Sequence, residues 1–313
     1  MVAPQVPTQS EVESLLVERS NWGRWGKDDE LGCLNLITPE KRVAAASLVR
    51  HGRTVTLSRK VVPSEASEAG SVRCDVSLHK LDERSLAAMD YFGLSYHGFS
   101  TTHIDALCHI SVDGTVWNGR ATSEVLEPHG ARWGDIDRWR SGIFTRGVLL
   151  DVPGFRGTRY VTPDEPVTGA ELDKIASSRR ITLEAGDAVL VHSGRTAWNE
   201  DNEPWETLGP RWVDPTAVST RPGLHVSCME FLRDHDVAVL LWDMMDLAPS
   251  GYSLAWSVHG VIRAFGLALI DNVSFDEVLP VSEEFKQWVF LLVAAPLRVS
   301  GGTGSPINPL AVF

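Results

Sequence analysis

Residues 100–110 read STTHIDALCHI and set His103, Asp105 and His109 in an otherwise apolar run. Side chains alternate between two faces along a β-strand, so a strand here places Phe99, His103 and Asp105 on one face. A helix would instead turn His103 and Asp105 about 200° apart. An aspartate is rarely buried without a partner. The stretch therefore predicts a strand whose imidazole and carboxylate either share a metal ion or are satisfied polar groups within the core.

Apolar segments farther along the chain predict buried central strands. These segments are residues 142–152 (GIFTRGVLLDV), 186–194 (GDAVLVHSG), 237–246 (VAVLLWDMMD), 267–273 (LALIDNV) and 287–299 (QWVFLLVAAPLRV). Helical patterns stand between them, at residues 168–179, 223–236 and 253–266. This alternation of strands and helices predicts an α/β fold with a mixed central sheet.

The N-terminal part of the chain predicts a helical arm. Residues 10–20 begin with Ser10, a good N-cap, and residues 38–52 begin with Thr-Pro and end with Gly, the signals of a helix start and stop. We find no internal repeat and no low-complexity linker. We therefore expect a helical arm over residues 1–51 and one larger domain over residues 52–313.

Composition excludes several classes of protein. The net charge of -12 argues against nucleic-acid partners and anionic membrane surfaces, which both attract basic patches. The four cysteines are scattered with no C-x-x-C pair, which fits a reducing compartment better than a disulfide framework. We see neither a signal peptide nor an apolar run of about 20 residues. We expect a cytoplasmic protein whose partners are a small-molecule substrate and other copies of the chain.

A metal at His103 and Asp105 needs a third ligand, because catalytic metal sites normally take three from the protein. His259 is the best candidate, since it lies among apolar residues where a solvated histidine is not expected. Asp271 stands at the end of an apolar segment that is predicted to be a strand, so it is a further candidate. Two classes fit this set: a non-heme iron oxygenase with a His/Asp/His triad, and a hydrolase in which His109 moves protons. The oxygenase pattern needs an arginine about ten residues after the last histidine, and the chain has none there.

The sequence also resembles the metal-dependent cyclase family, which includes bacterial kynurenine formamidase and isatin hydrolase. TTHIDALCH resembles the family signature H-x-G-T-H-x-D-x-P-x-H. HGVIRAFGLALIDNV and GGTGSPINPLAV are similar to later family segments, and the likeness covers residues 52–313. The arm before it is typical of a longer subgroup. The resemblance implies a swivelling β/β/α cyclase-like fold and a homodimer or homotetramer.

The resemblance also implies roles for individual residues. The implied metal ligands are His103, Asp105, His259 and Asp271, with Asp105 able to bridge two ions, and His109 is the implied general acid/base. Zinc and manganese are the ions expected, with no organic cofactor.

Two positions depart from the family pattern. Phe99 stands at the first ligand position, and His97 lies two residues, or about 7 Å, farther along a strand. Asp271 replaces the family's glutamate. Because even the loss of a supporting contact costs about 10–100-fold in metal affinity, we expect one tightly held ion at most.

Aromatic residues provide candidate substrate contacts. Trp22 and Trp25 either cover the pocket from the arm or attach the arm to the body, and Trp117 either lines the pocket or packs a turn. Phe99 and His97 complete the set of candidate substrate-binding residues.

Three functions remain open at this point. The first is a metal-dependent hydrolase that opens an amide, lactam or lactone bond of a small cyclic or aromatic substrate. The second is a cyclase or lyase of secondary metabolism, with or without a metal. The third is a non-catalytic binder of small molecules on the same fold.

Overall fold

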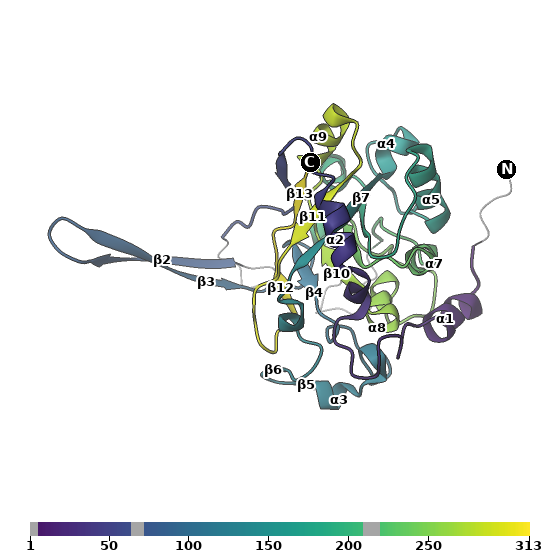
Figure 1. Cartoon of the computed structure of the whole chain (residues 1–313), viewed down its shortest axis with the longest axis horizontal. Helices are drawn as coiled ribbons and strands as arrows, with labels where there is room; N and C mark the ends of the chain where they lie inside the picture. The colour runs from purple at the N-terminus through teal and green to yellow at the C-terminus, as the bar shows by residue number, and fades with distance from the viewer. Residues whose placement is uncertain (1–5, 64–71, 209–219) are drawn as a thin grey trace.

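The structure is a computed structural model that describes residues 6–63, 72–208 and 220–313. Its centre is a nine-stranded mixed sheet in the order β1-β13-β11-β7-β8-β9-β10-β4-β12, which confirms the expected α/β class (Figure 1). The strands of this sheet are β1 (Thr54–Thr56), β4 (His103–Asp105), β7 (Ile143–Asp151), β8 (Ala188–His192), β9 (Val239–Trp242), β10 (Ala268–Asp271), β11 (Val289–Ala294), β12 (Gly304–Pro306) and β13 (Leu310–Val312).

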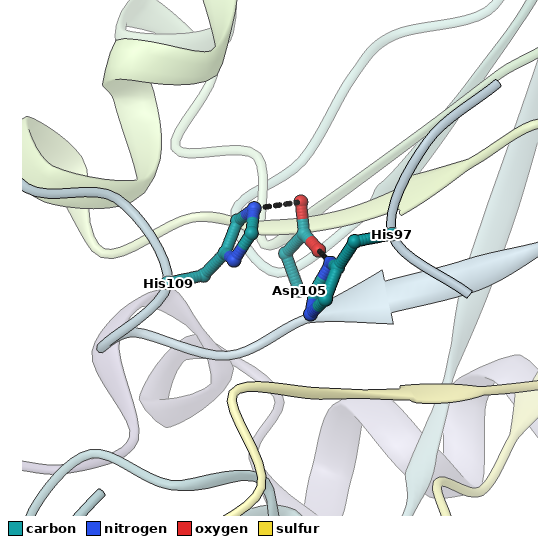
Figure 2. Close-up of side chains that lie close together, drawn as sticks. All are labelled: His97, Asp105 and His109. Atoms are coloured by element: carbon teal, nitrogen blue, oxygen red, sulfur yellow. Dashed lines mark ion pairs between the residues drawn. The ribbon is translucent and has the colours of Figure 1, made fainter. Parts of the chain in front are cut away.

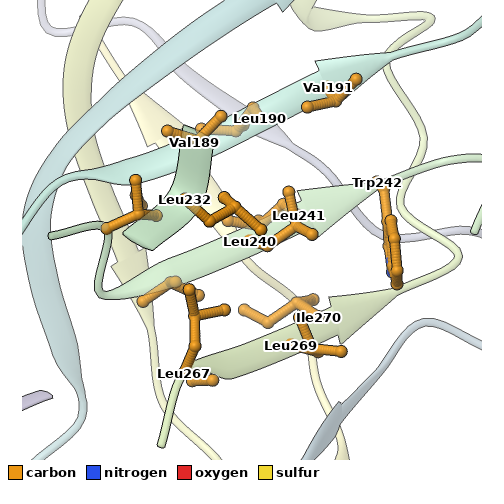
Figure 3. Packing of buried hydrophobic residues seen from close by; sticks show 14 of the residues in the cluster. Val189, Leu190, Val191, Leu232, Leu240, Leu241, Trp242, Leu267, Leu269 and Ile270 are labelled. Carbon is orange, nitrogen blue, oxygen red and sulfur yellow. The ribbon is translucent and has the colours of Figure 1, made fainter. Parts of the chain in front are cut away.

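Four parallel strands, β7 to β10, form the middle of the sheet. From Gly147 onward in β7, and in β8, β9 and β10, nearly all side chains are buried on both faces, as the continuous apolar runs predict. Figure 3 shows Val189–Val191, Leu240–Trp242 and Leu269–Ile270 stacked across the three strands β8, β9 and β10. The strands β11 and β4 pair antiparallel on the two sides of this core. The carboxyl ends of the four parallel strands therefore lie at the same edge of the sheet.

The helices and 3₁₀ turns of the described residues are α1 (Gln9–Glu18), η1 (Gly32–Leu36), α2 (Pro39–Ala46), η2 (Trp117–Gly119), α3 (Thr122–Val125), η3 (Ile136–Trp139), α4 (Val152–Arg156), α5 (Gly169–Ser178), α6 (Arg195–Asp201), η4 (Trp205–Thr207), α7 (Ser227–Asp234), η5 (Val258–Gly260), α8 (Val261–Phe265) and α9 (Val278–Phe285). None of them is long and apolar enough to cross a membrane.

The helix predicted over residues 253–266 is much shorter in the structure. It starts as η5 and continues as α8, which ends at Gly266 in the left-handed conformation, as predicted. Residues 253–257 stay outside the helix, and the N–H of His259 donates to Oδ1 of Asp246 at 3.1 Å. The late start of the helix therefore places His259 beside a carboxylate.

The N-terminal segment packs on the main body. The N-cap of α1 is Thr8, which forms a capping box with Glu11, so the cap predicted at Ser10 is wrong by two residues. The helix α2 begins at Thr38 and Pro39 as predicted, ends at Ala46, and packs on β7 and β11. Buried side chains of this segment, such as Val12, belong to the same apolar core as the central sheet.

Residues 72–94, for which no strand is predicted, form a long hairpin. Its strands are β2 (Val72–Lys80) and β3 (Leu86–Leu94), and the hairpin projects far from the rest of the chain (Figure 1). A second, short hairpin joins β5 (Leu126–Glu127) and β6 (Gly130–Ala131).

Candidate metal centre

Strand β4 is the centre of the candidate site. The strand β10 runs antiparallel to it, with Asp271 directly opposite His103. Directly opposed residues share one face of a sheet, as do residues two apart in one strand. Accordingly, Nε2 of His103 lies 3.5 Å from Oδ1 of Asp105 and 3.7 Å from Oδ2 of Asp271. The shared face expected for His103 and Asp105 is thus present, and pairing with β10 adds Asp271 to it.

The segment before β4 is a loop and not the strand that periodicity predicts. Gly98 turns the chain there with a φ of 141°, a value that side-chain-bearing residues rarely adopt. The turn brings Nδ1 of His97 to 3.1 Å from Oδ1 of Asp105, so the expectation that His97 lies too far along a strand is wrong. Phe99 packs on Trp205 instead, with ring centroids 5.4 Å apart.

His109 lies in the turn that follows β4 and faces the same carboxylate. Its ring stacks on that of His97 with centroids 4.1 Å apart, and its Nε2 lies 3.8 Å from Oδ2 of Asp105 (Figure 2). Burial lowers the pKa of His109 to about 4, although the Asp105 carboxylate opposes this shift. The imidazole is therefore neutral at pH 7, the form that binds a cation or accepts a proton.

Asp105 is a buried carboxylate without a hydrogen-bond donor. Its side chain is 1% exposed, and neither oxygen accepts a hydrogen bond from the described residues. Burial alone favours the neutral acid, but the imidazoles of His109, His97 and His103 outweigh it and hold the pKa of Asp105 well below its usual value. A buried charge is costly unless it is paired or coordinates a metal. The nitrogen and oxygen donors around Asp105 therefore fit a divalent cation such as zinc or manganese.

The described residues form two overlapping groups of candidate ligands. One is His97, Asp105 and His109, and the other is His103, Asp105 and Asp271, each with its ligand atoms within 4.8 Å of one another. Asp105 belongs to both groups, as a bridging ligand would. The geometry thus offers two adjacent positions, and occupation by one ion only stays a prediction.

The orientation of His103 is fixed by the loop before it. Its Nδ1 lies 2.9 Å from the carbonyl oxygen of Thr101, which can only accept. Nδ1 therefore donates to this carbonyl, and Nε2 is the ring nitrogen that faces the two carboxylates. Such support of the second ring nitrogen is usual for histidines that bind metals.

His259 lies outside both groups and acts on Asp271 in this structure. Its Nε2 is 3.1 Å from Oδ2 of Asp271, and its Nδ1 hydrogen-bonds to Asp246. Burial opposes protonation of His259, but Asp246 and Asp271 raise its pKa well above the usual value. Trp242 donates its indole N–H to the other oxygen of Asp271 at 2.5 Å. The metal-ligand role expected for His259 therefore stays a prediction, because the contacts seen here hold the carboxylate of Asp271 in place.

Asp246 and a second set of supporting residues were not predicted. The sequence signal that could have indicated Asp246 is a carboxylate directly after the buried strand β9.

The second set of supporting residues centres on Arg195, which is fully buried. Its Nη1 donates to Oδ1 of Asn272 at 2.7 Å, and its Nη2 donates to the carbonyl of Phe99. Asn272 in turn donates to the carbonyls of Gly98, at 2.7 Å, and Thr101, at 3.0 Å. This network holds the loop between His97 and His103 by its backbone.

The three tryptophans expected near the pocket attach the N-terminal segment. Trp117 is fully buried, and its indole N–H donates to the carbonyl of Asp29 at 3.1 Å. The ring of Trp25 lies 6.3 Å from that of Trp117, and Trp22 donates to the carbonyl of Arg263 at 2.7 Å. The contacts of Trp22 and Trp25 correspond to the alternative in which these two residues fasten the arm, and contact of any of the three tryptophans with substrate stays a prediction.

The cluster is open to solvent on one side. The side chains of His97 and His109 are 30% and 24% exposed, whereas those of His103, Asp105 and Asp271 are 1–3% exposed. A small molecule would therefore meet the stacked imidazoles first.

Comparisons with known proteins fit this fold. A family model described as "Putative cyclase" matches residues 42–249. A crystal structure described as a novel cyclase is 24% identical, with a TM-score of 0.82 over 95% of this chain and 99% of that one. Isatin hydrolase A from Ralstonia solanacearum is 17% identical, with a TM-score of 0.54 over 83% of this chain and 91% of that one. An isatin hydrolase bound to the product analogue thioisatinate is 17% identical, with a TM-score of 0.56 over 88% of this chain and 99% of that one. No curated protein sequence matches significantly.

Proposed function

The chain belongs to the putative cyclase family, and on that premise we propose that it is a metal-dependent hydrolase. Its substrate is a small cyclic or aromatic molecule with an amide, lactam or lactone bond. The similarity to isatin hydrolases, whose substrate isatin is a cyclic amide, supports this class of bond. Zinc and manganese are the ions proposed, without an organic cofactor.

One observation carries the proposal: the buried carboxylate of Asp105. Both of its oxygens lack a hydrogen-bond donor among the described residues, and three imidazole nitrogens lie 3.1–3.8 Å from them. A cluster built only for stability would place donors on this carboxylate, because an unpaired buried charge is strongly destabilising. The arrangement fits a site that holds a cation.

The residues at the open side handle the substrate. His97 and His109 are the two partly exposed members of the cluster. A substrate carbonyl that approaches Asp105 from solvent therefore passes these two imidazole rings. His109 transfers the proton between the attacking water and the leaving group, because its Nε2 lies at the exposed side of the cluster, 3.8 Å from Asp105. A bound divalent cation would supply Lewis acidity toward the carbonyl or the water.

The cyclase or lyase and the non-catalytic binder are the alternatives. The reason to consider a metal-free protein was the phenylalanine at a ligand position. The structure weakens that reason, since His97 brings an imidazole to the same carboxylate from the preceding loop. Two overlapping groups of candidate ligands around Asp105 favour retained chemistry over a decayed site.

The test measures metal content and turnover in the same samples. Purified protein is stripped with a chelator, reloaded with zinc or manganese, and assayed on N-acyl arylamines, lactams including isatin, and aryl lactones. We expect turnover only after reloading, and Asp105→Asn should lose both metal and turnover. Asp164→Asn, at an exposed carboxylate, is the matched control and should keep both. Equal turnover before and after reloading would support the metal-free lyase or cyclase, and tight ligand binding without turnover under any metal would support the binder.

A further inference from the structure

Three arginines gather around two aromatic rings beside the loop that leads into β4. The guanidinium carbon of Arg195 lies 4.6 Å from the ring centroid of Trp205, and that of Arg221 lies 5.0 Å from the ring centroid of Phe99. Arg59 comes from the segment after β1, and its backbone N–H donates at 2.8 Å to the side chain of the residue directly before β4. We call Arg59, Arg195 and Arg221 the arginine group.

The arginine group carries more positive charge than its ion pairs balance. Among the described residues, Glu206 is the one carboxylate within 4.0 Å of these guanidinium groups, at 3.2 Å from Nη2 of Arg195. Burial and the nearby charge of Arg59 lower the pKa of Arg195 to about 9, although Glu206 opposes this shift. Like charges that lie close together away from water are destabilising, and an anion offsets this cost.

Two other carboxylates near the arginine group are bound elsewhere. Asp243 accepts hydrogen bonds of 2.8–3.0 Å from three successive backbone N–H groups, the last of which belongs to Arg195. The carboxylate of Asp246 hydrogen-bonds to His259, and it is the backbone carbonyl of Asp246 that accepts from Nε of Arg221, at 3.2 Å. The charge of the arginine group is therefore available to an anionic ligand.

Two N–H groups of the arginine group have no acceptor among the described residues. They are Nε of Arg59 and Nε of Arg195, both buried atoms, and the whole Arg195 side chain is 1% exposed. Unpaired buried donors are rare in native proteins and costly, above all on charged groups. The N–H groups of a guanidinium form a planar fork that matches the two oxygens of a carboxylate. The unpaired donors therefore fit a carboxylate better than a neutral ligand.

The ring of Phe99 adds an apolar surface to this charged group. Trp205 is fully buried, whereas Phe99, Arg59 and Arg221 are only partly buried, so solvent reaches this side of the arginine group. A ligand ring that packs against Phe99 presents a carboxylate to the neighbouring guanidinium groups. This combination of an aromatic ring and arginines suits an aromatic carboxylate.

The arginine group lies beside the candidate metal centre. Phe99 is two residues from His97, so their Cα atoms are at most about 7 Å apart. Arg221 contacts the backbone of Asp246, whose carboxylate hydrogen-bonds to His259. This spacing is comparable to the length of a small aromatic molecule, so one such molecule can contact both sites.

We propose that the arginine group binds the carboxylate of a small aromatic molecule whose ring lies against Phe99. The second part of the proposal, which rests on the proposed function, is that this molecule is the substrate. The hydrolase then acts on an aromatic amide, lactam or lactone that carries a ring carboxylate. Arg59 and Arg221 bind this carboxylate, and Arg195 contributes charge while it holds the loop.

Calorimetric titration with benzoate and benzamide tests the carboxylate site, because the two compounds share a ring and differ in charge. We expect wild type, as purified, to bind benzoate at least about tenfold more tightly than benzamide. Arg59→Met and Arg221→Met should each weaken benzoate binding by about 10–100-fold. Arg179→Met should not, and it is the matched control because Arg179 is also partly buried and lies 3.2 Å from the ring centroid of Trp288.

A metal ion can also bind a carboxylate, so Asp105→Asn separates the two sites. This variant should lose its metal and keep its affinity for benzoate. Equal affinity of wild type for benzoate and benzamide would overturn the carboxylate site. So would benzoate binding that Asp105→Asn abolishes and both arginine variants keep. If an arginine variant does not fold, the two titrations of wild type and that of Asp105→Asn still decide the question.

A pair of substrates tests the second part. The compounds 4-acetamidobenzoate and acetanilide contain the same amide, and only the first has a ring carboxylate. We expect metal-loaded wild type to show a kcat/KM at least about tenfold higher for 4-acetamidobenzoate, and Arg221→Met to lose this preference with unchanged metal content. Equal kcat/KM for the two compounds in wild type would overturn the substrate assignment. If neither compound is hydrolysed while benzoate binds as expected, the substrate assignment fails and the carboxylate site stands.

Discussion

Replacement of Arg195 by methionine should lower the affinity for a metal ion without removing any candidate ligand. The substitution keeps most of the apolar stem and removes the guanidinium, which is buried and donates to Oδ1 of Asn272, to the carbonyls of Asp243 and Phe99 and, at 3.2 Å, to Oε2 of Glu206. These acceptors lose their donor, and the backbone of the loop that carries His97 loses one of its anchors.

The magnitude follows from the groups left unpaired. A buried polar group without its partner costs about 1–3 kcal/mol, and two of the four acceptors, Oδ1 of Asn272 and the carbonyl of Asp243, are buried. The sum, roughly 2–6 kcal/mol, agrees with about 3–5 kcal/mol for breaking a buried ion pair by removal of one partner. Since a whole domain is stable by about 5–15 kcal/mol, the variant should fold with a clearly lower free energy of unfolding. Its affinity for zinc should fall by about 10–100-fold, the usual effect of losing a group that orients ligands.

Urea unfolding followed by tryptophan fluorescence measures the first effect, and competition with a chelator measures the second. The control is Arg156→Met. Arg156 is also largely buried, with hydrogen bonds of 2.7 Å to each oxygen of Glu171 and to the carbonyl of Glu165, but it has no contact with the loop. The control should lose stability and keep its zinc affinity. Wild-type zinc affinity in Arg195→Met, or an equal loss in the control, would refute the reasoning.

Three further substitutions test other parts of the site. His97→Asn should lower metal content, whereas Phe99→Leu should keep it; elemental analysis of both proteins checks this, and equal metal content would contradict the placement of His97. Trp242→Phe removes an indole N–H from the β10 carboxylate and should weaken zinc binding by about 10–100-fold without loss of fold, as chelator competition will show. His192 has a pKa raised by its hydrogen bond to Asp151 against the effect of burial, so its contribution to stability is full below about pH 6.5 and is lost as the pH rises through the raised value. Urea unfolding of His192→Gln should therefore differ most from wild type at low pH within the folded range, and a pH-independent difference would contradict the linkage.

The central sheet was predictable because its parallel strands are largely buried on both faces. Such strands appear as continuous apolar runs, and β7 to β10 and β11 all lie within the predicted segments. The hairpin of β2 and β3 was not predictable in this way, because most of its apolar residues are exposed in the single chain.

The candidate site was predictable where one strand carries it and not where a loop does. Period-two alternation brought together His103 and Asp105, and the strand order added Asp271. The same alternation, extended backward, misplaced His97, because Gly98 breaks the strand with a backbone conformation that other residues avoid. A glycine beside a candidate ligand is therefore a reason to stop extrapolating a strand.

The two carboxylates of the cluster differ in how their charge is compensated. Asp271 accepts a hydrogen bond from Trp242 and faces His259, whose raised pKa makes it a cation beside this carboxylate. Asp105 has imidazole neighbours but no donor among the described residues. The free energy gained by a bound cation is larger where the buried charge is otherwise unpaired, because that charge has the most electrostatic cost to recover. A bound cation would therefore compensate mainly the charge of Asp105, the carboxylate that both candidate ligand groups share.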